Sequence, residues 1–327
     1  MEKQKLLFEI IKTRIPEQYR LVGVLEELLK MSSDSVYRRI RGETELSFSE
    51  LNVLCEKFHI SMDEIFNSKS IQSAVFQYMP VNFSDQESYI TYITRLLGTL
   101  TAFGQDQDKQ IYVTALDIPF YHFLAYPELM FFKLYAWNDT ITHTPLTYES
   151  FCNRLDWDAI IPVYRQMDES YRHIPSKEIW TNQTIDILLR LLEHYYEIGA
   201  FEKRETVLGL ISQLTHLMDT VRKYADEGYK SGGGKEIPFS LYLCSVDPEN
   251  NLMLIKRGEN ISCTIRLYTV NSIVTENHSL CLEMNKWIHD LILKSVLISG
   301  ASVRERIRFF RSSVNKITGL VNRIENE

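Results

Sequence analysis

The sequence lacks the features of a disulfide-rich or strongly basic protein. Its five cysteines (Cys55, Cys152, Cys244, Cys263 and Cys281) are widely spaced, odd in number and outside any paired motif. This usage excludes a disulfide framework and favours free thiols in a reducing compartment. Lys and Arg number 36 against 43 Asp and Glu, a net charge of −7. General attraction to nucleic acid or acidic membranes is excluded, so any DNA affinity must come from a local patch.

Apolar runs that could span a bilayer are also scarce. The longest candidate, Ile118–Trp137, is interrupted by charged residues and by Pro127. It therefore predicts two core helices that begin near Pro119 and Pro127. Met1 opens a charged segment with no apolar region after it, unlike a secretory signal. We expect a cytoplasmic protein with no membrane partner.

Catalytic and metal-binding motifs are missing as well. The sequence contains no HExxH, GxSxG or GxGxxG motif and no cysteine and histidine set at zinc spacing. Ser231–Lys235 resembles a phosphate-binding loop, but Tyr229 stands where the motif requires its first glycine and Glu236 follows the lysine. Its glycines predict a flexible connection. We expect no enzyme, no metal and no cofactor.

The most informative segment that is present, Leu21–Gly42, predicts two short helices joined by a tight turn. Ser32 is a favourable N-cap for the second helix because its hydroxyl can accept a hydrogen bond from a free backbone N–H. In that helix Val36 and Ile40 share one face, which we expect to be buried. The candidate outward and flanking residues are Ser33, Asp34, Ser35, Tyr37, Arg38, Arg39 and Arg41.

This outward surface predicts contacts with double-stranded DNA. An arginine can bond guanine O6 and N7 through two N–H groups in the major groove, and Arg38 is the predicted base reader. Arg39 and Arg41 are predicted to hold phosphates, which set position but carry no base sequence information. The other four residues complete the candidate contact surface.

Helical patterns on both sides extend this segment to a domain of residues 1–67. Lys5–Ile15 and Ser49–Phe58 carry apolar stripes, and the spacing of Ser61 and Glu64 is that of a capping box that opens a last short helix ending at Phe66. Together with the two helices of Leu21–Gly42, these patterns predict an all-α domain of five helices.

Residues 20–66 resemble the phage-repressor/Cro-like helix-turn-helix family, and the strings YRRIRGE, LSFSEL and HISMDEIF resemble a BetR-like bacterial subgroup of it. The resemblance covers about 47 of 327 residues. It implies that Leu21–Leu29 is the supporting helix, that Ser33–Arg41 is the recognition helix that reads DNA, and that Ile60–Phe66 completes the fold of the domain. The sequence departs from the family at Gly23, where a polar residue is usual, and at Lys30, a turn position that is often glycine.

The same residues have a plainer interpretation. Asp34 can pair with Arg38 four positions later, which would make this face an ordinary solvated helix surface. Residues 1–66 hold ten Lys and Arg against twelve Asp and Glu, so this region is not basic. Two alternatives to DNA binding therefore stay open: a protein–protein interaction adaptor, and an enzyme whose active site is hidden in the second domain.

The rest of the chain predicts a linker and a larger α+β domain. Residues 68–83 contain a proline and lack a helical stripe, which predicts a linker. Residues 84–327 combine long helical patterns with strand candidates. The strand candidates are Gln110–Ala115, Phe239–Val246, Leu252–Lys256 and Ile261–Val270.

The last of these strand candidates alternates cleanly between apolar and polar residues. Ile261, Cys263, Ile265 and Leu267 share one face, and Ser262, Thr264, Arg266 and Tyr268 share the other. One buried and one wet face predict a small antiparallel sheet backed by helices. This architecture resembles small-molecule sensor domains such as the GAF-like kind, an analogy of fold alone. We expect a small-molecule or protein signal on that basis.

The final segment carries a heptad stripe, which predicts a partner helix. A second copy of the chain is the expected partner, because repressor-type readers engage two DNA half-sites as dimers. The adjacent helix, Leu280–Ile298, is a second candidate for self-association, and packing of the stripe on its own domain is the alternative. The stripe consists of Val303, Ile307, Phe310, Val314, Ile317, Val321 and Ile324.

These patterns together predict a repressor-like transcriptional regulator of multidomain α and α+β architecture. A helix-turn-helix domain, residues 1–67, would bind double-stranded DNA through residues 33–41. A linker, residues 68–83, would lead to a sensor-like domain, residues 84–327, that forms the homodimer.

Overall fold

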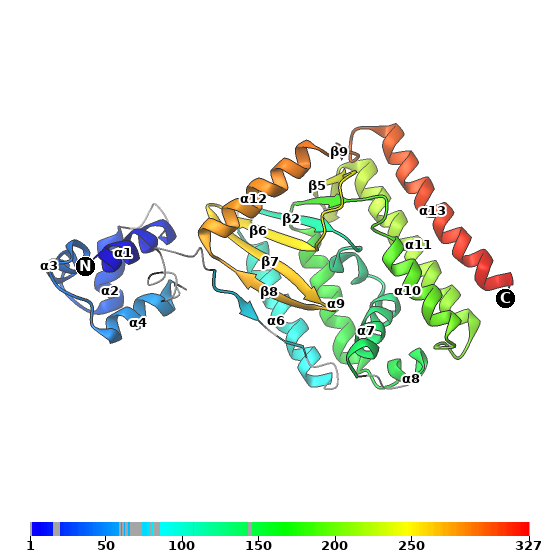
Figure 1. Ribbon diagram of the computed structural model, residues 1–327, viewed down its shortest axis with the longest axis horizontal. Coiled ribbons are helices and arrows are strands. Elements are labelled where there is room, and N and C mark those ends of the chain that lie inside the picture. The colour runs from blue at the N-terminus through cyan, green and yellow to red at the C-terminus, as the bar shows by residue number, and fades with distance from the viewer. Residues whose placement is uncertain are drawn as a thin grey trace. The chain divides into compact units, whose positions relative to one another are not determined.

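The chain divides into two units, Met1–Phe76 and Gln77–Glu327. The computed structural model describes residues 2–15, 20–58, 60, 62, 65, 74–78, 80–81, 86–106, 108–142 and 146–326 (Figure 1). Each unit has its own hydrophobic core, and each is described separately below.

The first unit is helical in its described part. It contains α1 (Glu2–Arg14), α2 (Leu21–Leu29), α3 (Ser33–Arg41) and α4 (Phe48–Lys57), at the positions that the apolar patterns predict. Their buried side chains, among them Leu7, Leu25, Val36 and Leu54, form one core. The fifth expected helix, Ser61–Phe66, lies mostly outside the described residues.

The second unit is built on one mixed sheet. Its described strands are β1 (Gln77–Tyr78), β2 (Lys109–Ala115), β3 (Ser176–Trp180), β4 (Tyr229–Gly232), β5 (Lys235–Leu243), β6 (Leu252–Arg257), β7 (Asn260–Tyr268), β8 (Asn271–Thr275) and β9 (Val296–Leu297). The order is β1-β8-β7-β6-β2-β3-β5-β4, with β9 also paired to β5. The pairs β2/β3 and β3/β5 are parallel, and the other pairs are antiparallel. The predicted α+β layout is confirmed.

The expectation of a small antiparallel sheet was wrong. Strand β3 joins β2 to β5 in parallel, and the long helical crossovers between these strands make that pairing possible. The sequence of β3, SKEIW, places Lys177 and Glu178 inside a five-residue strand, so it carries no apolar alternation. Because the sequence does not predict β3, it does not show that β2 and β5 belong to one sheet.

The sheet separates two layers of helices. Helix α12 (His278–Leu293) covers one face, where it packs on side chains such as Tyr112 and Ile179. The neighbouring strand residues Val113 and Trp180 face the opposite layer, because successive side chains of a strand alternate. In the described residues, that layer consists of the following helices: α6 (Gln86–Gly104), the short 3₁₀ helix η1 (Phe120–Phe123), α7 (Pro127–Thr142), α8 (Tyr148–Cys152), α9 (Trp157–Arg172), α10 (Asp186–Glu197), α11 (Arg204–Glu227) and α13 (Val303–Asn326).

Within the described residues, regular structure appears in both predicted connections. Within the expected linker, Gln77–Tyr78 pairs with β8, so the chain enters the second unit before Ser84. The expected flexible connection at Ser231–Lys235 is a hairpin between β4 and β5. Gly233 and Gly234 have φ of 56° and 77° there, as a two-residue hairpin turn requires. A two-residue strand and a glycine turn carry no hydrophobic pattern, so neither was recognised.

The apolar run Ile118–Trp137 becomes η1 and most of α7, both deeply packed in the core of the second unit. Pro119 caps η1, and Pro127 opens α7, as expected. Across the described residues, no helix reaches the length and mean hydropathy that crossing a bilayer requires.

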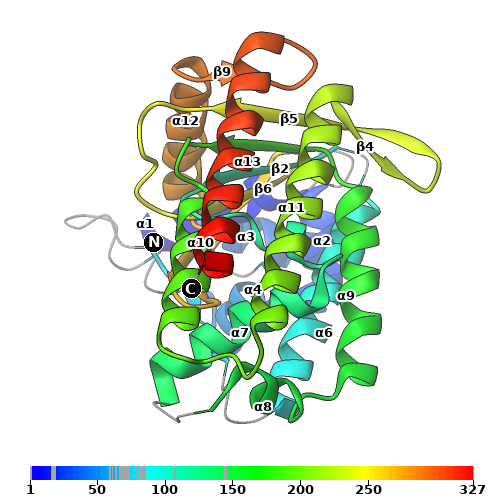
Figure 2. The same cartoon turned by 90° about the vertical axis from the view of Figure 1, so that its right-hand side faces the viewer.

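The heptad stripe of α13 is only partly exposed. Phe310, Ile317 and Ile324 are buried in the unit's own core, and α13 lies beside α10 and α11 (Figure 2). The prediction that all seven residues form a partner seam was therefore wrong. The face buried within the unit is centred between Arg306, Phe309 and Ser313, which the heptad pattern does not include. Val303, Ile307 and Val314 remain on the surface.

Candidate nucleic-acid interface

Helices α2 and α3 are joined by the three-residue connection 30–32. Lys30 ends α2 with φ of 52° and ψ of 48°. This is the left-handed conformation that a turn at this position requires. The Ser33 hydroxyl donates a hydrogen bond to the Glu26 carboxylate of α2. Leu25 and Val36 are both buried in the shared core. The connection and this packing fix which face of α3 points outward.

The predicted start of α3 is confirmed, but its predicted cap is not formed. Ser32 has the extended backbone of an N-cap residue, and α3 begins at Ser33. Its hydroxyl makes no hydrogen bond to a backbone N–H of the helix. The Oγ atoms of Ser32 and Ser35 lie 3.1 Å apart instead, so the two hydroxyls form a hydrogen bond with each other.

The outward surface of α3 presents two arginines. The Arg38 Nε lies 3.2 Å from an Asp34 carboxylate oxygen, and these side chains are 58% and 72% exposed. The Arg41 Nε lies 2.9 Å from a Glu43 oxygen, also at the surface. Exposed ion pairs of this kind contribute about 0–1 kcal/mol. Both guanidinium groups can therefore exchange a carboxylate partner for a nucleic acid at little cost.

Arg39 does not belong to this surface, contrary to the prediction that it holds a phosphate. Its Nη2 lies 2.7 Å from a Glu50 carboxylate oxygen of α4, and the side chains are only 18% and 17% exposed. Its Nη1 also donates to the Ser35 carbonyl at 3.3 Å. The guanidinium is therefore committed to holding α3 against α4. The sequence predicts Arg39 on the flank of the helix, where the position of α4 decides its environment.

Glu50 has a second structural task at the start of α4. It forms a capping box with Ser47, in which each side chain bonds the other residue's backbone N–H. Burial raises the pKa of the Glu50 carboxyl, but the hydrogen bonds from Arg39 and Ser47 outweigh this and hold the pKa below its ordinary value. The Ser47 and Glu50 spacing is a readable capping-box signal in the sequence.

Gln4 of α1 holds the segment that follows α3, and sequence reasoning missed it. Its Nε2 donates to the carbonyls of Arg39 and Thr44 at 2.7 and 2.8 Å. Its Oε1 accepts from the Leu46 N–H at 3.1 Å. These contacts are 35 to 42 positions apart in the chain, so no local pattern announces them. Gln4 therefore holds the end of α3 and the backbone that follows it against α1.

The structure therefore sorts the seven predicted contact residues. Tyr37, Arg38 and Arg41 are exposed, with Asp34 beside them. Ser33 is exposed but bonded to Glu26, and Ser35 is half-buried. Arg39 is structural. What remains is a surface with two guanidinium groups and one phenol, chemistry that suits base edges, phosphates and planar stacking.

The second unit contains a different polar cluster, which is fully enclosed. Glu178 of β3 is buried and accepts hydrogen bonds from the Tyr171 hydroxyl, from the Trp180 Nε1 at 2.8 Å and from a ring nitrogen of His122 at 2.9 Å. The Lys230 Nζ lies 3.0 Å from both the Tyr171 carbonyl and the Ser176 hydroxyl. It also lies 3.5 Å from the centre of the Tyr171 ring.

Burial and the neighbouring polar groups together set the pKa values in this cluster. It lowers the pKa of Lys230 to about 7, although Glu178 and Asp168 act in the opposite direction. Burial also raises the pKa of Glu178, but His122, Tyr171 and Lys230 outweigh it and hold that pKa below its ordinary value. The cluster has no open face for a substrate, since Glu178 and Lys230 are both fully buried. The described residues include no group of side chains that could hold a metal ion.

Comparison with known proteins gives no family for this chain: no protein-family model, curated protein or solved structure matches it. The five cysteines are free and buried.

Proposed function

We propose that this chain is a sequence-specific transcriptional regulator that places α3 in the major groove of double-stranded DNA. The observation that carries the proposal is the orientation of α3. Val36 is buried, whereas Tyr37, Arg38 and Arg41 extend from the other side of the helix. A short helix that presents arginines in this way fits the width of the major groove.

The two exposed arginines have different proposed roles. Arg38 reads a guanine through two N–H groups, and its pair with Asp34 opens on binding. Arg41 holds a phosphate, which contributes affinity without sequence information. Arg39 is left out of the DNA contact set because Glu50 already binds its guanidinium.

We propose further that two copies of the chain associate through the exposed part of α13. Val303, Ile307 and Val314 are 56%, 44% and 42% exposed, which is unusual for a line of apolar side chains on one helix. Ile307→Asp should give the monomer mass in light scattering, because an aspartate in an apolar seam is costly to bury. A dimer mass that persists in this variant would reject the seam. Phe310→Asp is a poor test, since Phe310 is buried in the unit's own core.

Salt dependence tests DNA binding directly. Titration of the full chain with mixed-sequence duplex DNA at about 50 and 200 mM salt should show a steep loss of affinity at the higher salt, because bound phosphates release counterions. Arg41→Ala should reduce the logarithmic salt slope by about one. Arg222→Ala is the matched control, since Arg222 is also an exposed arginine in a surface ion pair, with Asp226, and belongs to the second unit, outside α3.

A protein–protein adaptor is the rival function, and one observation favours it. Phe48, at the start of α4, is 75% exposed. An adaptor would show no salt-dependent DNA binding, and Arg41→Ala would behave like Arg222→Ala. That outcome would overturn the proposed regulator. The expected cytoplasmic location and the expected lack of enzyme activity stay predictions.

A further inference from the structure

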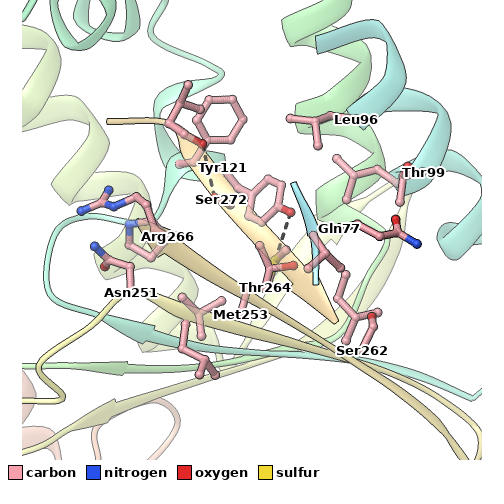
Figure 3. Close-up of a pocket in the computed structure, with 18 of the residues that line it drawn as sticks. Gln77, Leu96, Thr99, Tyr121, Asn251, Met253, Ser262, Thr264, Arg266 and Ser272 are labelled. Atoms are coloured by element: carbon pink, nitrogen blue, oxygen red, sulfur yellow. Dashed lines mark hydrogen bonds between the residues drawn. The ribbon is translucent and has the colours of Figure 1, made fainter. Parts of the chain in front are cut away.

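The second unit holds a cavity of about 350 Å³ on the helix-rich face of the sheet (Figure 3). Its floor is the face of β7 that the sequence predicted to be wet: Ser262, Thr264 and Arg266 all line the cavity. The opposite side chains of β7, such as Cys263, pack under α12. The predicted alternation of β7 holds from Ile261 to Arg266 but fails at Leu267, which is 51% exposed beside a β-bulge. The polar side chains of β7 line a cavity that α6 and η1 border.

The cavity is mostly apolar and aromatic, with a polar end. Tyr92 and Leu96 of α6, Phe120 and Tyr121 of η1 and Trp137 of α7 form its walls. Arg266 and Asn251 lie together at one end (Figure 3). Pockets with apolar walls and a few convergent polar groups are the usual sites of small ligands.

The polar end carries an unmatched positive charge. The nearest carboxylate oxygen to Arg266, on Asp117, is 3.9 Å from its Nη1. That carboxylate is already neutralised by Lys133, whose Nζ lies 2.5 Å away with both side chains buried. Among the described residues, the Arg266 guanidinium makes no hydrogen bond, so its N–H groups are open to an anionic ligand.

The other charged groups that line the cavity lie away from Arg266. Arg257 and Glu276 lie at the other end of the strands and have opposite charges. Arg257 is also engaged by Asp106, with Nε 3.6 Å from a carboxylate oxygen, and its guanidinium lies over the Phe103 ring. An anion is therefore drawn to the Arg266 end.

A hydroxyl group points into the cavity between its ends. The Tyr121 hydroxyl donates to the Met253 sulfur at 3.2 Å, a weak acceptor (Figure 3). Burial raises the pKa of Tyr121, so this hydroxyl keeps its proton. It can turn to a carbonyl or hydroxyl oxygen of a ligand without giving up a strong hydrogen bond.

We propose that this cavity binds a small aromatic carboxylate, with its carboxylate on Arg266 and its ring among the aromatic walls. The carboxylate matches the positive charge at the Arg266 end, and the apolar and aromatic walls contact the ring. The volume suits a single ring or fused pair of rings with a short side chain. The inference concerns the second unit alone and does not rest on DNA binding by α3.

The ring of Tyr121 connects this site to the buried polar cluster. It stacks on the Tyr171 ring, with the ring centres 4.7 Å apart and the planes 9° from parallel. Tyr171 in turn donates to Glu178 and lies beneath Lys230. A ligand that contacts Tyr121 therefore touches a residue that packs on this buried cluster, and its binding to the folded state should stabilise the second unit.

Calorimetric titration of the full chain tests the proposal. The probes are phenylacetate, 3-phenylpropionate and indole-3-acetate, each compared with its neutral amide. At least one carboxylate should bind at least tenfold more tightly than its amide and should raise the melting temperature of the second unit. Arg266→Gln should weaken carboxylate binding at least tenfold and leave amide binding unchanged. Arg266→Lys, which keeps the charge, should recover part of the loss.

Two further variants make the result decisive. Arg257→Gln is the matched control, because it removes a cavity arginine from the other end and should leave carboxylate affinity within about twofold. Leu96→Trp fills the cavity from α6 and should abolish binding of carboxylate and amide alike. The proposal is overturned if no carboxylate binds at millimolar concentration, if the amide binds as tightly, or if Arg266→Gln has no effect in a chain whose circular dichroism matches the wild type.

Discussion

The two units differ in where they keep their charged side chains. In the first unit, Arg38 and Arg41 lie at the surface in weak pairs with neighbouring acids. In the second unit, Glu178 and Lys230 are fully buried among aromatic rings. A surface arginine can leave its partner for another molecule, whereas a buried carboxylate is held by the fold around it. The comparison predicts that removing a buried charge costs stability, whereas removing Arg38 or Arg41 costs the proposed DNA contacts.

The largest expected effect is at the centre of the second unit. Glu178→Leu leaves Tyr171, His122 and Trp180 without their shared acceptor, and should lower the free energy of unfolding by about 4 kcal/mol. Urea unfolding followed by tryptophan fluorescence measures it. Glu178→Gln, which keeps an acceptor, should lose less. Glu193→Ala removes a surface partner of Arg323 and should cost no more than about 1 kcal/mol. Equal losses at Glu178 and Glu193 would break the comparison.

Lys230 should make the second unit more stable as the pH rises above about 7. Its pKa is about 7 in the folded chain against an ordinary 10.5. Between these values the unfolded chain binds more protons, so stability should rise with pH, by up to about 1.4 kcal/mol per unit. Urea unfolding at pH 7.5, 8.25 and 9 measures the slope. Lys230→Met should remove this contribution; a variant with the wild-type slope would show that Lys230 is charged in the folded chain.

The comparison can also be made within α3 alone. Arg39→Ala removes a half-buried partner of Glu50 and should destabilise the first unit by about 1–2 kcal/mol. Arg41→Ala should change stability by less than about 0.5 kcal/mol, because its pair with Glu43 is exposed. Thermal unfolding by circular dichroism separates the two. Equal destabilisation would show that Arg39 contributes no more to stability than the exposed Arg41.

The smallest expected effect is at the turn between α2 and α3. Lys30 has positive φ, which costs a residue with a side chain about 1 kcal/mol, so Lys30→Gly should stabilise the first unit by about 0.5 kcal/mol after the added entropy of the unfolded glycine. Gly42→Ala is the mirror control, since Gly42 has φ of 79° and should lose stability. Destabilisation by Lys30→Gly would mean that the lysine side chain contributes more than its backbone strain costs.

The sequence predicted best where structure follows local spacing. The bounds of α2 and α3, the start of α7 at Pro127 and the alternation of β7 up to Arg266 all come from residues a few positions apart. Val36 points inward and Arg38 outward for the same reason. Local spacing also predicted the exposed arginines of α3 that carry the proposed function.

The sequence failed where distant elements decide. Arg39 is structural because Glu50 lies against it, and half of the α13 stripe is buried because α10 and α11 pack there. Strand β3 was missed because its Glu178 resembles a surface residue until His122, Tyr171 and Trp180 surround it. Burial of this kind is a property of tertiary packing, which no local pattern records.

The most direct measurement is the base discrimination of the wild-type chain and of Arg38→Ala. A duplex selected from random DNA by the full chain is compared with all of its single-base variants in competition binding. We predict that Arg38→Ala loses about 1–3 kcal/mol of discrimination at one guanine-containing base pair and retains it at the others. If the wild-type chain selects no duplex over random DNA, or if Arg38→Ala discriminates equally at every position, α3 is not a reader of DNA.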